Sequence, residues 1–313
     1  KNLMDDICKV AKQFITHGEI KNLQEFGNGN INDTYLVDIS GGRSEKFVLQ
    51  RINTNVFPKP KLIIDNLRAL TNHVRDQLSN EKNENNRRWE FPTIRETVSG
   101  EDFHIDSKGG FWRGISYIND ARTFDNVLNF EHAFEAGYAL GRFQSLAHDL
   151  ETNRMHDTLV GFHITPGYLS YFDQVKDRFV EGKWSYHFKY CQDFIEDHRH
   201  KVSVLENAKE DRKLRMHIIH GDPKINNFMI CNRTGQAVGV VDLDTVKPGL
   251  IHYDIGDCLR SACNPLGEET KDFEDVHFDL DLARSILDGY LSVARPFFSQ
   301  ADFDFLYDAI WLI

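Results

Sequence analysis

The feature that most constrains this chain is a polar loop enclosed by three short apolar segments. An apolar segment from 216 to 219 leads into the loop, a second from 228 to 231 leaves it, and a third from 238 to 241 delivers Asp242. Short apolar runs bounded by turn residues are typical of buried strands. The sequence therefore predicts three strands whose ends bring polar side chains to one place. The loop between the first two reads His220-Gly221-Asp222-Pro223-Lys224-Ile225-Asn226-Asn227.

Three of these polar residues match the needs of phosphoryl transfer. Asp222 is placed to accept the proton of an attacking hydroxyl group, and we predict it to be catalytic. Asn227 and Asp242 offer an amide and a carboxylate oxygen, which are hard ligands that favour Mg²⁺ over Zn²⁺. The order H-x-D-x-x-x-x-N, followed by a further Asp, is the arrangement used by protein-kinase-like enzymes. We therefore expect a nucleotide and Mg²⁺ as cofactors.

Four further residues near this loop are candidates for supporting roles. Lys224 lies inside the loop, and we predict that it neutralises charge on the transferred phosphoryl group or bonds to the substrate. Asp244 would point away from Asp242 in a continuing strand but could approach the metal or substrate in a turn. His220 is a candidate for substrate contact or support. Asp254 is interpreted as a buried carboxylate that braces the loop.

A glycine-bearing loop near the N-terminus is the candidate nucleotide-binding segment. Its residues Gly27, Asn28, Gly29, Asn30 and Asn32 lie between two strand-like segments. By itself the pattern could be an ordinary hairpin turn, and it is not the phosphate-binding GxxxxGK[ST] motif. In a kinase, backbone N–H groups at such glycines can approach phosphates closely.

Arg51 is the candidate phosphate-binding cation of the N-terminal region. It ends the strand that follows the glycine-bearing loop, where kinases place a phosphate-pairing Lys. A guanidinium can make the same contact with a bidentate grip. The alternative is an ordinary exposed strand Arg. Asp65 is the nearest acidic candidate to pair with Arg51.

The periodicity along the chain predicts an α+β fold with a β-rich N-terminal lobe and a mainly helical C-terminal lobe. Together with the order of the loop motif, which is that of protein-kinase-like enzymes, this implies a bilobal, protein-kinase-like fold. An antiparallel sheet with one main helix forms the N-terminal nucleotide-binding lobe, residues 1–118, and a larger, mostly helical lobe at 119–313 holds the catalytic loop and the substrate site. The chain stops in an apolar helix without a cap, so we expect further residues beyond 313. The expected strands are 35–39, 46–52, 93–98 and 110–117, and the expected helices are 5–17, 60–78, one beginning at 130, 168–179, 188–205, a short one after 254, 280–294 and 302–313.

Bulk composition favours a soluble globular protein over a nucleic-acid or membrane protein. The net charge of −11 and pI near 5.7 argue against a nucleic-acid partner. No apolar run approaches the roughly 18 residues of a membrane span, and no signal-peptide pattern opens the chain, so a cytoplasmic location is expected. The five scattered cysteines predict neither disulfides nor a zinc site. We expect a monomer or a weak homodimer.

These motifs together resemble the aminoglycoside phosphotransferase and choline kinase superfamily, whose members use the H-x-D-x-x-x-x-N loop and a following metal-binding Asp. Choline kinases also carry Arg at the position corresponding to Arg51. Within the superfamily, the segments 27–35, 49–57, 222–227 and 241–250 look like bacterial N-acetylhexosamine 1-kinases. The similarity runs from about residue 20 to the end, and Pro223, where Thr is expected, is a small departure.

The resemblance implies ATP- and Mg²⁺-dependent phosphorylation of the anomeric hydroxyl of N-acetylglucosamine or N-acetylgalactosamine to the sugar 1-phosphate, a step of carbohydrate metabolism. Asp222 then acts as base on O1, and Asn227 and Asp242 hold the metal. One alternative is a kinase of another small hydroxyl compound, of the choline or ethanolamine, homoserine, methylthioribose or aminoglycoside type. A second is a catalytically inactive, kinase-like binding module, which the intact Asp222, Asn227 and Asp242 disfavour. ATP and GTP both remain open as donors.

Overall fold

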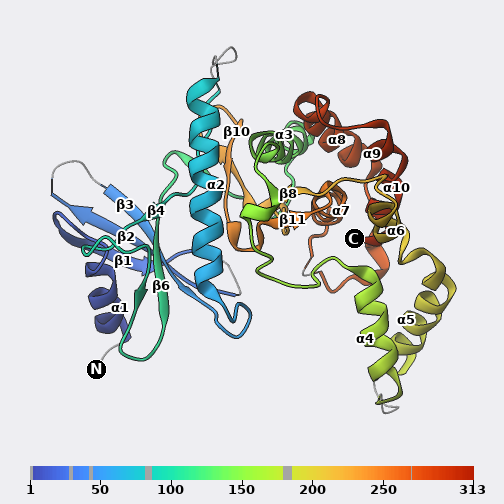
Figure 1. Cartoon of the computed structure of the whole chain (residues 1–313), viewed down its shortest axis with the longest axis horizontal. Helices are drawn as coiled ribbons and strands as arrows, with labels where there is room; N and C mark the ends of the chain where they lie inside the picture. The colour runs from blue at the N-terminus through green and yellow to red at the C-terminus, as the bar shows by residue number, and fades with distance from the viewer. Residues whose placement is uncertain (1–2, 28–30, 42–44, 82–86, 179–184, 269) are drawn as a thin grey trace.

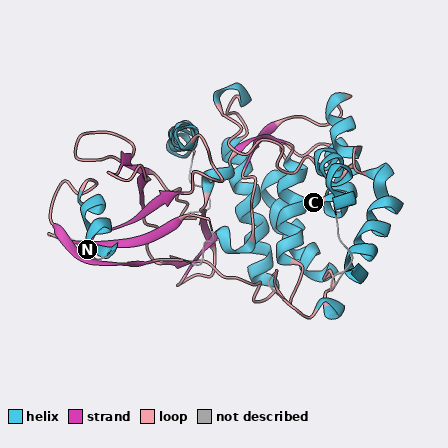
Figure 2. Cartoon of the chain, turned by 90° about the horizontal axis from the view of Figure 1, so that it is seen from below, coloured by secondary structure: helices cyan, strands magenta, loops and turns pink. Residues whose placement is uncertain are grey.

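Strands gather at the N-terminal end of the molecule and helices fill the C-terminal end (Figures 1 and 2). This arrangement comes from a computed structural model that describes residues 3–27, 31–41, 45–81, 87–178, 185–268 and 270–313. The N-terminal strands form one antiparallel sheet, and the C-terminal part is mainly helical. The predicted α+β fold class is therefore confirmed.

The N-terminal sheet is built around the predicted hairpin. β2 and β3 pair antiparallel from Asp33↔Arg51 to Ile39↔Glu45, and β3 pairs in turn with β6. The expected strand at 93–98 is reduced to two residues, Ile94–Arg95, at the edge of the sheet. The strands in spatial order are β1 (Glu19–Glu25), β2 (Asp33–Ser40), β3 (Glu45–Ile52), β6 (Phe111–Ser116) and β4 (Ile94–Arg95), with β5 (His104–Ile105) also paired to β6.

The two faces of this sheet have different environments. Side chains alternate between faces along a strand, so Phe47 and Leu49 share one face. That face packs on α1 (Leu3–Lys12) and buries Phe14 and Trp112 in a separate small core. The opposite face carries polar residues at its centre, among them Gln50, whose cross-strand partner on β6 is Arg113. The first face therefore forms a core with α1, and the second presents polar side chains.

The C-terminal part is organised by a close helix pair, α3 (Phe130–Ala147) and α8 (Leu280–Ala294). Glycines permit the approach: a Cβ on Gly137 would lie 2.7 Å from the carbonyl carbon of Ile286, and one on Gly289 would lie 2.8 Å from that of Phe134. Such distances are inside van der Waals contact, so only glycine fits at these crossings. Asp279 caps α8 at the predicted start by accepting from two backbone N–H groups.

The three strands predicted around the polar loop are all present, but they belong to two small sheets. β8 (His217–Ile219) pairs with β11 (Lys247–Gly249), whereas β9 (Phe228–Cys231) pairs with β10 (Ala237–Val240) and β7 (Ala121–Arg122). The remaining helices are α2 (Pro60–Asn80), α4 (Thr165–Val175), α5 (Ser185–His198), α6 (Val204–Glu210), α7 (Ile251–Ala262), α9 (Gln300–Asp304) and α10 (Leu306–Leu312).

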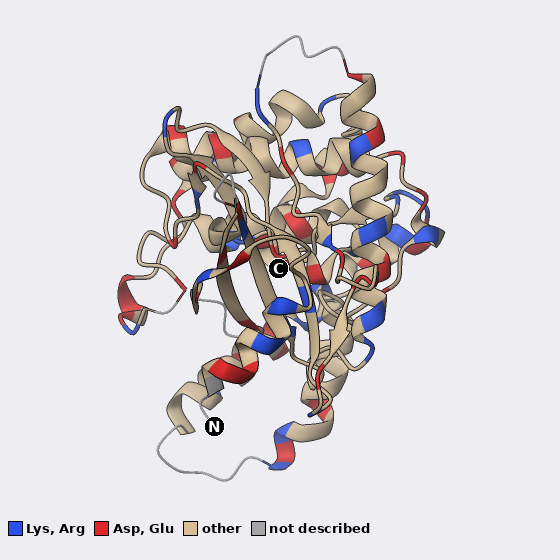
Figure 3. Cartoon of the chain, turned by 90° about the vertical axis from the view of Figure 1, so that its left-hand side faces the viewer, with Lys and Arg blue, Asp and Glu red and all other residues tan. Residues whose placement is uncertain are grey.

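Two helix predictions at the C-terminal side differ from the structure. The single helix expected at 302–313 is divided into α9 and α10, because the backbone at Phe305 has φ −102° and ψ 6°, outside the α-helical range. The helix expected at 188–205 is likewise divided between α5 and α6. Within the described part of the chain, no helix combines the length and apolarity of a membrane span. Acidic and basic residues are interspersed on the face shown in Figure 3.

Candidate active site

The polar loop leaves β8 through a turn that only glycine tolerates. Gly221 has φ +89°, and a Cβ there would press into the carbonyl oxygen of Thr245 and lie 3.0 Å from the Thr245 Cβ. Asp254 of α7 holds the same turn, because its carboxylate accepts from the N–H groups of His220 at 2.9 Å and Gly221 at 2.8 Å. Gln144 of α3 donates a third bond to it at 3.0 Å. Asp254 thus forms the bracing contacts expected from the sequence.

Asp254 holds the loop from a fully buried position. Burial raises the pKa of its carboxyl group, and the nearby His220 and the donated hydrogen bonds oppose that rise. A buried carboxylate that accepts from several N–H groups is a strong anchor, because its removal would leave every one of these donors buried without an acceptor. The position of Asp222, one residue after Gly221, therefore depends on Asp254.

His220 connects the loop to the end of β10. Its Nε2 lies 2.9 Å from the Val241 carbonyl oxygen, and its Nδ1 lies 3.3 Å from the Asp222 backbone nitrogen, so both ring nitrogens have a partner. The ring is fully buried. Thr245 Oγ1 also donates to the His220 carbonyl oxygen at 2.9 Å. His220 positions the residues on either side of it and leaves neither ring nitrogen free for substrate.

Asp222, Asn227 and Asp242 are joined by short backbone connections. Asn227 Nδ2 donates to the Asp222 carbonyl oxygen at 2.7 Å, which leaves its Oδ1 as the open acceptor. The Val241 N–H donates to the Asn227 carbonyl oxygen at 2.9 Å, one residue before Asp242. Asn227 is buried, whereas the Asp222 side chain is 21% exposed. The Asp222 carboxylate is therefore partly accessible from solvent.

Asp242 adopts a backbone conformation that is uncommon for a residue other than glycine. Its φ of 60° and ψ of 61° are left-handed, and they turn the chain from β10 into a short 3₁₀ turn, residues 243–245. Burial of its carboxyl group and the like charges of Asp244 and Asp222 raise the pKa of Asp242, whereas Arg113 and Lys224 lower it. The residue as a whole is exposed to solvent. A cation at this position would relieve the repulsion among the carboxylates.

The donor set suits Mg²⁺. Asn227 Oδ1 and the Asp242 carboxylate are hard oxygen ligands, and the surrounding carboxylates favour positive charge. No group of three or more His, Cys, Asp and Glu side chains that could hold a metal occurs among the described residues. A metal here would need additional oxygens from outside the protein. Mg²⁺ commonly takes such oxygens from water and phosphate.

Lys224 and residues of α7 surround the Asp222 carboxylate with charge. Lys224 Nζ lies 3.5 Å from Asp222 Oδ2. Burial lowers the pKa of Lys224, but the carboxylates of Asp222, Glu268 and Asp257 outweigh that effect and raise it. Lys224 is therefore a cation held beside the Asp222 carboxylate.

Asp257 is a buried carboxylate that the sequence reasoning left without a defined role. Its Oδ1 accepts from Arg260 Nε at 3.0 Å and Nη2 at 2.8 Å, and Arg260 also pairs with Glu268 at 2.7 Å. Burial and the charge of Asp222 raise the pKa of Asp257 to about 7, against the lowering effect of Arg260. Its Oδ2 is buried and bonds to no described residue. Asp257 thus places an unused acceptor atom near Asp222.

The glycine-bearing loop reaches the site through Asn32. Asn32 Nδ2 donates to Asp244 Oδ2 at 2.7 Å, and its Oδ1 accepts from the Asn53 N–H at 2.9 Å. Asp244 lies in the turn after Asp242 and is buried, so it faces the N-terminal sheet as a turn allows. Gly27 has φ +79°. The other predicted nucleotide-binding residues, Asn28, Gly29 and Asn30, lie outside the described residues.

The structure does not bring Arg51 to this site. Arg51 shares the face of β3 that carries Phe47 and Leu49, its side chain is 48% exposed, and its nearest acidic partner is Asp33 at 3.6 Å. The predicted Arg51–Asp65 ion pair is wrong, because Asp65 pairs instead with Lys61, one turn earlier on α2, at 2.9 Å. Strand alternation explains the position of Arg51. Every second side chain of a strand lies on the same face, and Phe47 and Leu49 are buried beside α1, so Arg51 lies on that face too.

Arg113 of β6 is the cation that reaches the site from the sheet, and the sequence reasoning missed it. Its Nε and Nη2 donate to Gln50 Oε1 at 3.0 and 2.7 Å, and Nη2 lies 2.6 Å from Asp244 Oδ1. The Arg113 and Asp244 side chains are only 3% and 2% exposed. We call the face of the sheet that carries Thr34, Gln50 and Arg113 its site face.

His163 is a second residue that the sequence reasoning missed. It lies between α3 and α4, has φ 67°, and is buried with its Nε2 2.6 Å from the Gly221 carbonyl oxygen. Burial lowers its pKa, against the raising effect of the Gly221 carbonyl. No pattern of the sequence marks His163, because a lone His between two helices carries no periodic signal.

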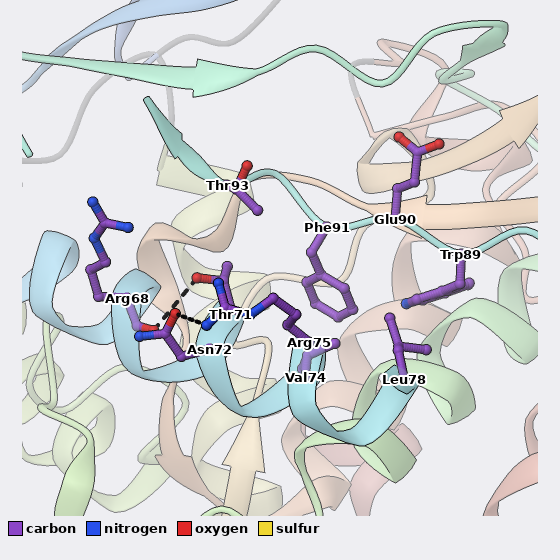
Figure 4. Close-up of a pocket in the computed structure, with 10 residues that line it drawn as sticks. All are labelled: Arg68, Thr71, Asn72, Val74, Arg75, Leu78, Trp89, Glu90, Phe91 and Thr93. Carbon is purple, nitrogen blue, oxygen red and sulfur yellow. Dashed lines mark hydrogen bonds between the residues drawn. The ribbon is translucent and has the colours of Figure 1, made fainter. Parts of the chain in front are cut away.

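A pocket of about 190 Å³ lies away from these residues, between α2 and the segment 89–93 (Figure 4). None of the sequence-predicted site residues lines it, so it carries no part of the proposed chemistry. Its lining residues are Arg68, Thr71, Asn72, Val74, Arg75, Leu78, Trp89, Glu90, Phe91 and Thr93.

Comparison with known proteins relates this chain to a family and to a fold. A model of the phosphotransferase enzyme family matches residues 22–273. An aminoglycoside phosphotransferase from Alicyclobacillus acidocaldarius is similar in structure, with a TM-score of 0.62, 15% identity, and coverage of 97% of this chain and 80% of that one. A microcompartment-associated aminopropanol kinase is similar with a TM-score of 0.58 and 15% identity, and the match covers 97% of this chain and 86% of that one. An APH(2") phosphotransferase in complex with GDP and kanamycin is similar with a TM-score of 0.59 and 13% identity, and the match covers 98% of this chain and 86% of that one. At identities this low, the structural similarity shows the fold alone.

Proposed function

Because the chain belongs to the phosphotransferase enzyme family, a family of small-molecule phosphotransferases, we propose that it transfers the terminal phosphoryl group of ATP to the anomeric hydroxyl of an N-acetylhexosamine. The observation that carries this proposal is the connected arrangement of Asp222, Asn227 and Asp242, which links a solvent-accessible carboxylate to two oxygen ligands. The product would be the sugar 1-phosphate.

Each residue of the site has a role in the proposed reaction. Asp222 accepts the proton of the sugar O1 as the new P–O bond forms, or positions that hydroxyl in line with the phosphoryl group. Lys224, 3.5 Å from Asp222, offsets negative charge on the transferred group. Asn227 Oδ1 and the Asp242 carboxylate would hold Mg²⁺, which neutralises charge on the nucleotide phosphates when bound. Asp254 holds the loop in place.

The choice of an N-acetylhexosamine is supported by the motifs at 27–35, 49–57, 222–227 and 241–250, which resemble those of N-acetylhexosamine 1-kinases. Lys224 beside Asp222 and Arg260 beside Asp257 each pair a carboxylate with a cation, which weakens the attraction of these two carboxylates for an ammonium group.

A kinase of amino alcohols or aminoglycosides is the second candidate. Glu268 also pairs with Arg260, so this cluster holds one more carboxylate than it holds cations. The carboxylates are those of Asp222, Asp257 and Glu268, and the cations are Lys224 and Arg260. This excess would attract a cationic acceptor. The similar structures include an aminopropanol kinase and an aminoglycoside phosphotransferase, which agrees with this alternative.

The proposal is tested by product analysis with a panel of acceptors. Purified protein is incubated with Mg²⁺, ATP or GTP, and N-acetylgalactosamine, N-acetylglucosamine, galactose, aminopropanol, ethanolamine or kanamycin, and products are identified by ³¹P NMR. We expect a phosphate signal coupled to the anomeric proton with the N-acetyl sugars. The methyl glycoside of N-acetylgalactosamine is the matched control, because its O1 is blocked, and it should give no product.

The variant Asp222→Asn completes this test. Loss of the proton acceptor should reduce turnover by about 10²- to 10⁴-fold and leave nucleotide binding in place. Phosphorylation of aminopropanol or kanamycin with no turnover of N-acetyl sugars would replace the sugar acceptor by the second candidate. Wild-type activity in Asp222→Asn would contradict the proposed site itself.

A further inference from the structure

The site face of the sheet carries a continuous row of polar side chains across three strands. Thr34 of β2, Gln50 of β3 and Arg113 of β6 are direct cross-strand neighbours. Gln50 Nε2 donates to Thr34 Oγ1 at 3.1 Å, and Gln50 Oε1 accepts from Arg113. Kinases place a phosphate-binding Lys on the third strand of this lobe. Here β3 presents a neutral amide to the site, and the positive charge stands on β6.

Arg113 also connects the sheet to the turn that follows Asp242, the proposed metal ligand. Its guanidinium lies 2.6 Å from Asp244, two residues after Asp242. Arg51, by contrast, lies on the opposite face beside Asp33 with nearly half of its side chain in solvent. A nucleotide whose phosphates share a metal with Asp242 would therefore approach Arg113 and remain remote from Arg51.

The contacts of Arg113 hold it ready for an anion without using all of its donors. Gln50 and Asp244 engage Nε and Nη2, and Nη1 donates to no described residue. A guanidinium carries five N–H donors in a planar fork that matches two phosphate oxygens. Since the side chain is buried and fixed by two partners, little conformational entropy is lost when it binds a ligand.

We propose that Arg113 is the cation that contacts the nucleotide phosphates in this protein, supplied by β6 in place of β3, with Gln50 and Asp244 orienting its guanidinium. The inference rests on the proposed function for the presence of a nucleotide at Asp242. It assigns Arg51 no part in phosphate binding. It also gives Gln50 a defined purpose, because a second cation at that position would repel Arg113.

Nucleotide binding to three proteins tests this assignment: wild type, Arg113→Met and Arg51→Gln. Dissociation constants for ATP and for adenosine are measured by isothermal titration calorimetry with Mg²⁺. We expect Arg113→Met to weaken ATP binding by about 10- to 100-fold, the range of a hydrogen-bonded charge pair, and to change adenosine binding by less than about twofold. Arg51→Gln should leave both constants unchanged.

A rescue variant separates phosphate contact from structural support. Adding Gln50→Lys to Arg113→Met restores a cation at the neighbouring site-face position, and it should recover part of the ATP affinity without affecting adenosine. If Arg113→Met fails to fold because Asp244 is left unpaired, the double variant Arg113→Gln/Asp244→Asn removes both charges together and is measured in its place. Circular dichroism and thermal unfolding establish which variants are folded.

Three results would overturn the assignment: unchanged ATP affinity in the folded Arg113 variant, equal losses for ATP and adenosine, or a selective loss of ATP binding in Arg51→Gln. The third would return the phosphate contact to Arg51. Failure of the proposed function is distinguishable, because the wild-type protein itself would then not bind ATP.

Discussion

Replacing Gly221 by Ala tests whether the turn before Asp222 governs both stability and catalysis. Gly221 has φ +89°, a conformation that costs a residue with a Cβ about 1–2 kcal/mol. The added methyl would also press into the Thr245 backbone, with the Thr245 Cβ at 3.0 Å. Relieving that overlap adds about 1–3 kcal/mol. Gly221→Ala should therefore lower the free energy of unfolding by about 2–5 kcal/mol in total.

Gly235→Ala is the matched control. Gly235 also has a left-handed backbone, φ +69°, but nothing lies within 4 Å of a Cβ placed there. It should cost only the conformational part, about 1–2 kcal/mol, and leave turnover unchanged. In Gly221→Ala, a displacement of Asp222 by about 1 Å should reduce kcat by about 10²-fold. Urea unfolding and initial rates measure both effects. Equal stability and equal activity of the two variants would refute the reasoning.

Three further variants extend the account. Lys224→Met should lower kcat by about 10- to 100-fold with little change in the KM for ATP, because it removes a charge beside Asp222; an unchanged kcat in steady-state kinetics would exclude that role. Gly137→Ala should destabilise the α3–α8 contact by about 3 kcal/mol or more in urea unfolding, whereas Gly167→Ala, where a Cβ meets nothing within 4 Å, should be near neutral. His163 is buried with a lowered pKa, so the stability it contributes is present above about pH 6.5 and is lost as the pH falls. His163→Gln should therefore show a smaller loss of urea midpoint than wild type between about pH 7.5 and 5.5, and equal losses would contradict this.

Local patterns predicted the strands around the site well. Apolar runs between turn residues indicated β8, β9 and β10. The spacing of acidic and amide residues selected Asp222, Asn227 and Asp242, whose roles stay a prediction. Helix α8 occupies the predicted range because its periodicity and its cap, Asp279, both lie in the sequence. In these cases the information is carried by residues close together in the chain.

Contacts between segments that are far apart in the sequence could not be predicted. Arg113 meets Gln50 and Asp244 only because β3 pairs with β6 and the two lobes come together, and neither relation is visible in a single sequence. The side on which Arg51 lies is visible in the sequence, because the apolar Phe47 and Leu49 indicate the buried face of β3 and strand alternation puts Arg51 on that same face.

The central claim, that Asp222, Asn227 and Asp242 surround one metal and one acceptor hydroxyl, is tested most directly by anomalous X-ray diffraction. Crystals grown with Mn²⁺ and a non-hydrolysable ATP analogue would locate the ion without ambiguity. The account predicts a single strong peak within about 2.0–2.3 Å of Asn227 Oδ1 and an Asp242 carboxylate oxygen, with the terminal phosphate directed at Asp222. A metal–nucleotide complex bound elsewhere, with these two ligands unengaged, would contradict it.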